Sequence, residues 1–112
     1  MTKREMREPT FLVLSALAAG PQHGYSLISE TARLSGGRVK LQPGSLYAAL
    51  DRLSDEGSIR VDREEVVDGR LRRYYGLTDQ GEQELRSEID RLEANVVVAR
   101  TNLKIRMAGG LA

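Results

Sequence analysis

Cysteine and tryptophan are absent from this 112-residue sequence, and histidine occurs once, at His23. The lack of cysteine excludes disulfides, thiolate catalysis and cysteine-bound metals. A zinc site built from one imidazole and a few carboxylates is rare. The chain also has no glycine-rich phosphate loop, no nucleophile elbow and no cluster of metal-ligand residues. We therefore expect no enzymatic activity, no catalytic residue, no bound metal and no cofactor.

Long apolar runs are missing as well, since no stretch approaches the ~20 apolar residues that span a bilayer. Residues 1–6 mix charges of both signs, which is not the pattern of a signal peptide. These two absences predict a cytoplasmic protein without a membrane partner.

The overall composition is ordinary, with 40% apolar residues, 29% charged residues and a formal net charge of +1. This balance and the chain length are typical of one globular domain with one added element. Because the net charge is so small, any attraction to nucleic acid must come from the distribution of the basic residues.

Apolar periodicity and the positions of glycine and proline predict three short helices, then a hairpin, then a long helix. The first helix starts near Pro9, the second near His23 and the third near Gln42. Two strands, 59–66 and 71–77, flank Asp68-Gly69, which is a strong signal for a two-residue hairpin turn.

This order predicts a fold that is mainly α with a small β-hairpin (α+β), arranged as a winged helix-turn-helix. Thr78 is placed to cap a final helix that runs from Asp79 to about Met107. We expect a DNA-binding domain over 1–77, a dimerisation helix over 78–108 and a flexible tail over 109–112.

A turn at Asp68-Gly69 fixes the register of the hairpin. The expected cross-strand pairs are Val67 with Arg70, Val66 with Leu71, Glu65 with Arg72, Glu64 with Arg73, Arg63 with Tyr74, and Asp62 with Tyr75. Arg72 and Arg73 therefore face glutamates that neutralise part of their charge. Arg70 has no acidic residue opposite it, so it is either a contact for the minor groove of DNA or a solvated side chain.

The third helix is the candidate recognition element. Leu46, Leu50 and Leu53 lie on one face, which leaves other side chains to reach base edges and phosphates. The full set of expected DNA contacts is Arg38, Lys40, Ser45, Tyr47, Arg52, Arg70 and Arg72. Two alternatives stay open: Tyr47 is a lid over the core, and Arg52 is the ion-pair partner of Asp55 or Glu56. His23 and Tyr25 are interpreted as packing and capping groups.

The last helix carries an apolar stripe with heptad-like spacings of 4, 3, 4, 3 and 4, formed by Leu85, Ile89, Leu92, Val96, Ala99 and Leu103. The small domain cannot cover such a stripe, whereas a second copy can, so we expect a homodimer; the alternative is a helix that folds back on its own domain. The groove between two such helices is a candidate site for a small-molecule effector of unknown identity, beside Asn95, Val96 and Ala99, and the alternative is that no effector binds.

Several segments together resemble the PadR-like family of transcriptional repressors. The matching runs are Leu12-Val13-Leu14, Gly20-Pro21-Gln22-His23-Gly24-Tyr25, Pro43-Gly44-Ser45-Leu46-Tyr47-Ala48-Ala49-Leu50, Leu53 with Glu56-Gly57, and Arg73-Tyr74-Tyr75-Gly76-Leu77-Thr78 with Gly81. The resemblance implies a homodimer of the short branch, with one C-terminal helix, that binds a palindromic operator in double-stranded DNA and blocks transcription. Gln42 stands where the resemblance leads us to expect a serine or threonine that caps the third helix. No aromatic residue follows Tyr75, so the last helix has no ring against which a flat hydrophobic drug could stack at a dimer interface.

The function favoured by the sequence is therefore a homodimeric, sequence-specific transcriptional regulator that acts as a repressor. The alternative is a winged-helix protein–protein interaction module without specific DNA binding. The basic residues around the third helix and at the hairpin tip favour DNA.

Overall fold

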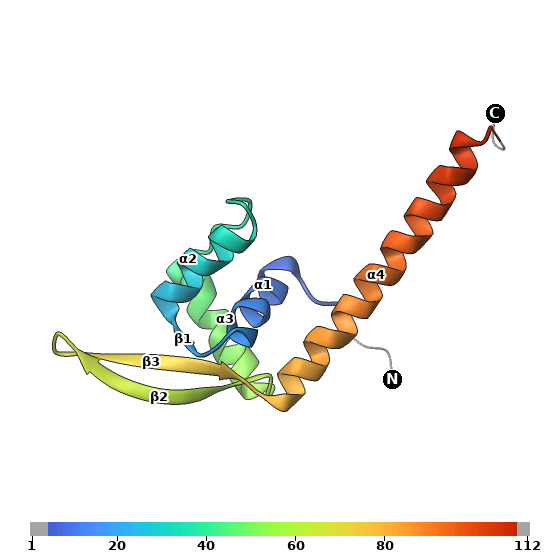
Figure 1. Ribbon diagram of the computed structural model, residues 1–112. Coiled ribbons are helices and arrows are strands. Elements are labelled where there is room, and N and C mark those ends of the chain that lie inside the picture. The colour runs from blue at the N-terminus through green and yellow to red at the C-terminus, as the bar shows by residue number, and fades with distance from the viewer. Residues whose placement is uncertain (1–4, 110–112) are drawn as a thin grey trace.

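The computed structural model describes residues 5–109. Its elements follow the order α1 (Glu8–Ala18), β1 (Gln22–His23), α2 (Gly24–Leu34), α3 (Pro43–Asp55), β2 (Ile59–Val67), β3 (Arg70–Leu77) and α4 (Asp79–Met107). The three short helices pack together above a hairpin that projects to one side, and α4 leaves the opposite side of the domain as a single rod (Figure 1). The expected tail lies outside the described residues apart from Gly109.

The core is formed by the apolar faces that the helical periodicity predicts. Leu14 of α1, Leu27 of α2, and Leu46 and Leu50 of α3 are completely buried. Ile59 and Tyr75 bring the roots of β2 and β3 into the same cluster. The first helix is buried on most sides, as its apolar sequence requires, because α2, α4 and β3 all contact it.

The sheet has three strands in the order β1-β3-β2, all antiparallel, rather than the two that the sequence predicts. The additional strand is only the pair Gln22–His23, which aligns with Tyr75 and Tyr74 of β3. A strand of two residues is too short to have a periodicity, so the sequence does not reveal it. It ties the root of the hairpin to the start of α2.

The turn at the hairpin tip agrees with the prediction, because Asp68 and Gly69 both have positive φ, 52° and 75°. The five expected pairs from Val67–Arg70 to Arg63–Tyr74 are confirmed. The sixth is wrong: Val61, not Asp62, faces Tyr75, because the ladder contains a β-bulge between Val61 and Arg63.

The bulge has a physical reason. Without the extra residue, the uninterrupted alternation would place Arg60 and Asp62 opposite Leu77 and Tyr75, on the face that packs against the helices. With it, the apolar residues Ile59 and Val61 take those positions. Ile59 is then almost completely buried.

Helix α4 begins as predicted. The Thr78 side chain accepts a hydrogen bond from the Gly81 backbone N–H at 3.0 Å, and Asp79 and Glu82 lie in the first turn. Its 29 residues correspond to a rod of about 43 Å at ~1.5 Å per residue. In the part of the chain that the structure describes, no helix is long and apolar enough to cross a membrane.

Candidate nucleic-acid interface

The outer surface of α3 carries the side chains that the helical spacing predicts. Leu46, Leu50 and Leu53 point into the core, while Ser45 and Tyr47 are exposed at its N-terminal end. Pro43 occupies the first turn, and the Gln42 side chain forms no capping hydrogen bond. The backbone N–H groups at this end therefore stay open to an external acceptor, such as a phosphate oxygen.

Tyr47 is partly exposed, at 45%, and partly packed. Its hydroxyl lies against the backbone of Gly24, where a Cβ atom would be 2.4 Å from the phenolic oxygen. Helix α2 therefore supports the ring of Tyr47 from behind and fixes the direction in which it projects. Tyr47 therefore agrees in part with both alternatives, because one side of its ring is packed and the other is exposed.

Arg52 lies at the other end of α3. Its guanidinium pairs with Glu56 at 3.3 Å and donates a hydrogen bond to the Thr10 hydroxyl at 3.1 Å. It lines a groove of about 1030 Å³ formed by α1, the end of α3 and the first half of α4. This placement separates Arg52 from Ser45 and Tyr47, and it favours the alternative in which Glu56 is its partner.

Two expected contacts precede α3 in the loop after α2. Arg38 forms an ion pair with Glu8 at the start of α1. Lys40 is exposed and, among the described residues, has no carboxylate within ion-pair distance. Lys40 is therefore the cation of this loop whose charge is directly available to an anion.

The arginines of the wing, defined here as residues 59–77, differ in how they are paired. Arg73 forms the expected ion pair with Glu64, at 3.2 Å. The Glu65 carboxylate accepts a hydrogen bond from Arg63 at 2.9 Å, which lowers its pKa, and the charge of Arg72, which lies opposite Glu65 as predicted, lowers that pKa further. Glu65 therefore neutralises part of the Arg72 charge as expected, although its hydrogen-bonded partner is Arg63. Arg70 is exposed at the tip and forms no ion pair within residues 5–109.

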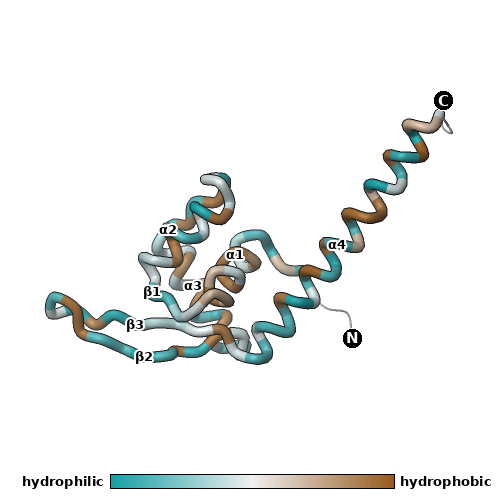
Figure 2. The backbone as a smooth tube through the Cα atoms, in the orientation of Figure 1, coloured by the Kyte–Doolittle hydropathy of each residue, from teal (hydrophilic) through white to brown (hydrophobic). Residues whose placement is uncertain are grey.

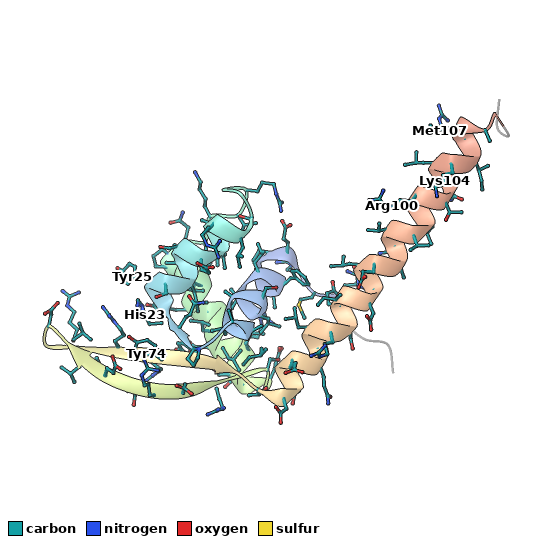
Figure 3. The ribbon with its side chains drawn as sticks, in the orientation of Figure 1. His23, Tyr25, Tyr74, Arg100, Lys104 and Met107 are labelled. Carbon is teal, nitrogen blue, oxygen red and sulfur yellow. The ribbon has the colours of Figure 1, made fainter. Side chains whose placement is uncertain are left out.

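His23 caps α2 as predicted, since its ring accepts from the Ser26 backbone N–H at 3.5 Å. Tyr25 was expected to pack, and this is wrong: 73% of it is exposed. Figure 3 shows His23, Tyr25 and Tyr74 close to one another where α2 meets the wing. The sequence pattern missed this cluster because Tyr74 reaches His23 only through β1, the strand that it failed to predict.

The apolar stripe of α4 divides into two parts. Leu85 is buried in the core of its own domain, with 8% exposed. The prediction that Leu85 contacts a second chain is therefore wrong. Ile89 and Leu92 are half-exposed, and Val96 and Leu103 are more exposed, at 48% and 58%. Ala99 is exposed too. Because the helix projects away from the domain, the alternative in which it folds back is wrong, and Figure 2 shows apolar residues distributed along this projecting half.

The described residues, 5–109, contain no group of three histidine, aspartate or glutamate side chains that could hold a metal ion. The chemistry that the surface offers is the binding of anions and apolar surfaces, through arginine, lysine, tyrosine and exposed aliphatic side chains.

Known proteins with a similar sequence include transcriptional regulators, as the binding surface described above suggests. Residues 13–87, which are 75 of the 112 residues, match the transcriptional regulator PadR-like family. The chain belongs to this family. As a PadR-like transcriptional regulator it has the winged-helix fold predicted from its sequence, and the match runs from the second half of α1 to the first turns of α4.

Two relatives and one solved structure illustrate the similarity. Transcriptional regulator Rv3488 of Mycobacterium tuberculosis is 40% identical over 81 residues, 72% of each protein. An uncharacterised 37.1 kDa protein in transposon Tn4556 of Streptomyces fradiae is 44% identical over 77 residues, 69% of this chain and 21% of that protein. The structure of Bacillus subtilis PadR in complex with operator DNA aligns with a TM-score of 0.64 and 29% identity, covering 70% of this chain and 46% of that one.

This PadR-like chain is shorter than several proteins that it matches. It spans 21% of the length of one curated relative and 42% of two others. The similarity to those proteins therefore covers only a part of each of them.

Proposed function

We propose that this chain is a homodimeric, sequence-specific DNA-binding regulator that represses transcription from a palindromic operator. The observation that carries the proposal is its similarity, over 70% of its length, to Bacillus subtilis PadR, whose structure contains operator DNA. The surface described above supports it, because exposed cations and a tyrosine gather around the start of α3 and on the wing. Such a protein acts at the chromosome, in the cytoplasm.

In this proposal residues 1–77 bind the duplex. Ser45 and Tyr47 contact base edges and sugars in the major groove, Lys40 contacts the adjoining backbone, and Arg70 and Arg72 contact the flanking minor groove. Arg38 and Arg52 contribute only if phosphates replace their present partners, Glu8 and Glu56. We therefore expect Lys40 and Arg70 to contribute more to affinity than Arg38 and Arg52.

Residues 78–108 hold the two chains together. The part of the stripe that remains uncovered in one chain runs from Ile89 through Leu92, Val96 and Ala99 to Leu103. A second copy of the same helix buries it and relates two recognition helices by a two-fold axis. Such an axis suits half-sites about 34 Å apart, so the operator is an inverted repeat. A small molecule bound between the paired helices, beside Asn95 and Ala99, would change that spacing and hence the affinity.

Selection from a random pool of duplexes tests DNA recognition. We expect an inverted repeat to be enriched, and its affinity to fall steeply with salt because phosphate contacts release counterions. Lys40→Ala and Arg70→Ala each reduce the salt slope by about one unit, whereas Arg86→Ala on α4 leaves it unchanged. Transcription in vitro from a promoter that contains the repeat then falls as protein is added. If no sequence is enriched, the protein-interaction module is the better hypothesis.

Sedimentation equilibrium at micromolar concentration tests the dimer. Val96→Asp places a charge in the apolar stripe and yields single chains. Ala94→Asp is the matched control, because position 94 lies on the opposite side of the helix from position 96 at 100° per residue. Single chains of the unaltered protein, both alone and with the selected duplex, would contradict the homodimer.

A further inference from the structure

The wing is joined to the helical body through a very small strand. Strand β1 consists of Gln22 and His23, and it pairs with Tyr75 and Tyr74 at the root of the wing. Beyond this point β2 and β3 continue to the turn at Asp68-Gly69 and project past the helices (Figure 1). The angle of the wing therefore depends on contacts at its root.

His23 takes part in three of those contacts at once. Its backbone belongs to β1, next to Tyr74. Its ring caps α2, with the Ser26 hydroxyl 2.8 Å from Nε2 and the Ser26 backbone N–H directed at Nδ1. The same ring meets Tyr74 edge to face, with centroids 5.4 Å apart and planes at 87°. One side chain thus touches the start of α2 and the central strand of the sheet.

The contact continues across the wing. The Arg63 guanidinium lies 3.9 Å from the centre of the Tyr74 ring, and Arg63 donates a hydrogen bond to Glu65 at 2.9 Å. A connected series, Ser26, His23, Tyr74, Arg63 and Glu65, therefore runs from α2 through β3 to β2. Aromatic edge contacts and cation–π contacts both depend on geometry, so each member limits the orientation of the next.

We propose that His23 is a positioning residue that sets the angle between the wing and the α2–α3 unit. It acts through the Tyr74 ring. The resulting wing angle lets α3 and the wing contact one DNA duplex at the same time. This inference rests on the proposed function for its consequence on DNA, but the wing angle itself is a property of the protein alone. Burial and the nearby Arg72 lower the pKa of His23, which keeps the ring neutral and able to accept from Ser26.

Two substitutions separate the parts of this role. His23→Asn keeps a side chain that caps helices well and removes the ring. His23→Phe keeps a ring edge for Tyr74 and removes the acceptor. If the ring positions the wing, His23→Asn widens the range of wing angles and His23→Phe leaves it unchanged. Tyr74→Leu removes the other ring while leaving an apolar residue that fits a strand, so it reproduces the effect of His23→Asn.

The absence of cysteine from the sequence makes the wing angle directly measurable. Spin labels on Val66→Cys in the wing and Arg33→Cys in α2 report one distance by pulsed electron resonance, in full-length protein diluted with unlabelled chains. We expect a narrow distribution in the parent and in His23→Phe, and a distribution at least twice as broad in His23→Asn and Tyr74→Leu. Equal widths in all four proteins, each checked for an unchanged far-ultraviolet circular dichroism spectrum, would overturn the proposal.

A footprint on the selected duplex supplies the second measurement. A loose wing must be ordered on binding, which we expect to lower affinity about tenfold. Protection is lost at the outer edges of the site and kept at its centre. A uniform loss across the site would show a general structural role and overturn the proposal. If the unaltered protein binds no duplex, the proposed function fails, and the distance measurement still decides the role of His23.

Discussion

Arg38 and Glu8 form a two-point ion pair, with Nη1 3.0 Å from Oε1 and Nη2 2.9 Å from Oε2. The pair joins the loop before α3 to the first turn of α1. Both side chains are at least half exposed, so water and salt screen the attraction, and the pair contributes little to folding stability. Its main consequence is that the Arg38 charge is held by a carboxylate instead of being offered to a phosphate.

The first prediction follows from this pair. Glu8→Gln removes the carboxylate charge and releases Arg38, so we expect affinity for the selected duplex to rise by about two- to fivefold at low salt. Fluorescence anisotropy titration measures it. The same change in an Arg38→Gln background should have no effect. An equal gain in both backgrounds would mean that loss of negative charge alone, not release of Arg38, raises the affinity.

The second prediction concerns Gly24 and Tyr47. In Gly24→Ala the new methyl group overlaps the phenolic oxygen, so the Tyr47 ring must move from the surface that supports it. We expect a loss of operator affinity of about five- to twentyfold with little change in the helical circular dichroism signal. A double-mutant cycle with Tyr47→Ala decides the cause, because Gly24→Ala has no further effect once the ring is gone. Additive losses would refute the explanation.

The third prediction separates two leucines of one stripe. Leu85→Ala opens a cavity in the core of the domain and lowers the free energy of unfolding by about 2–5 kcal/mol at every protein concentration. Leu103→Ala weakens the association of two chains, so its cost in urea unfolding changes with concentration. Unfolding curves at two concentrations tenfold apart measure both effects. If both variants depended on concentration in the same way, Leu85 would belong to the interface after all.

The fourth prediction is a pH dependence. Burial lowers the pKa of His23 below its ordinary 6.5, and Arg72 acts in the same direction while Glu65 opposes it. The unfolded chain then takes up a proton at a higher pH than the folded chain does. The free energy of unfolding is therefore highest above about pH 6.5 and falls as the pH drops below it.

Other groups with shifted pKa values do not obscure this step. Arginine partners lower the pKa values of Glu8, Glu30, Glu65 and Glu88, so their contributions are lost at more acidic pH. Urea unfolding between about pH 7 and about pH 5.5 isolates the imidazole. His23→Asn should flatten the dependence in that interval. A slope that survives in this variant would assign it to another group.

The elements that the sequence predicts well are those with a local signal. Asp68-Gly69 fixes the turn because a two-residue hairpin needs positive φ at both positions, and this fixes the neighbouring register. Thr78 predicts the start of α4, and the glycine pair that begins at Gly109 predicts its end. The outward face of α3 follows from three leucines at helical spacing. Each of these signals lies within a few residues of the feature that it predicts.

The features that the sequence does not predict depend on contacts between distant segments. The bulge at Asp62 arises because Tyr75 and Leu77 require apolar partners, which is visible only once the sheet packs on the helices. Leu85 has the same periodicity as Leu103, and only the position of the domain separates their roles. The pairing of Arg38 with Glu8 spans 30 residues, and similarly the Glu65 carboxylate selects Arg63 over the Arg72 opposite it.

Helix α4 runs without interruption from Leu85 in the core to Leu103 at the far end of the stripe. The number of residues between these two positions therefore sets the angle, around the helix axis, between the face that packs on the domain and the exposed stripe. One residue inserted in this interval would rotate the outer end by about 100° relative to the winged domain, whereas seven inserted residues would nearly restore the original angle. In the proposed dimer, the length of this interval therefore determines which way the two α3 helices point, independently of any residue that touches DNA.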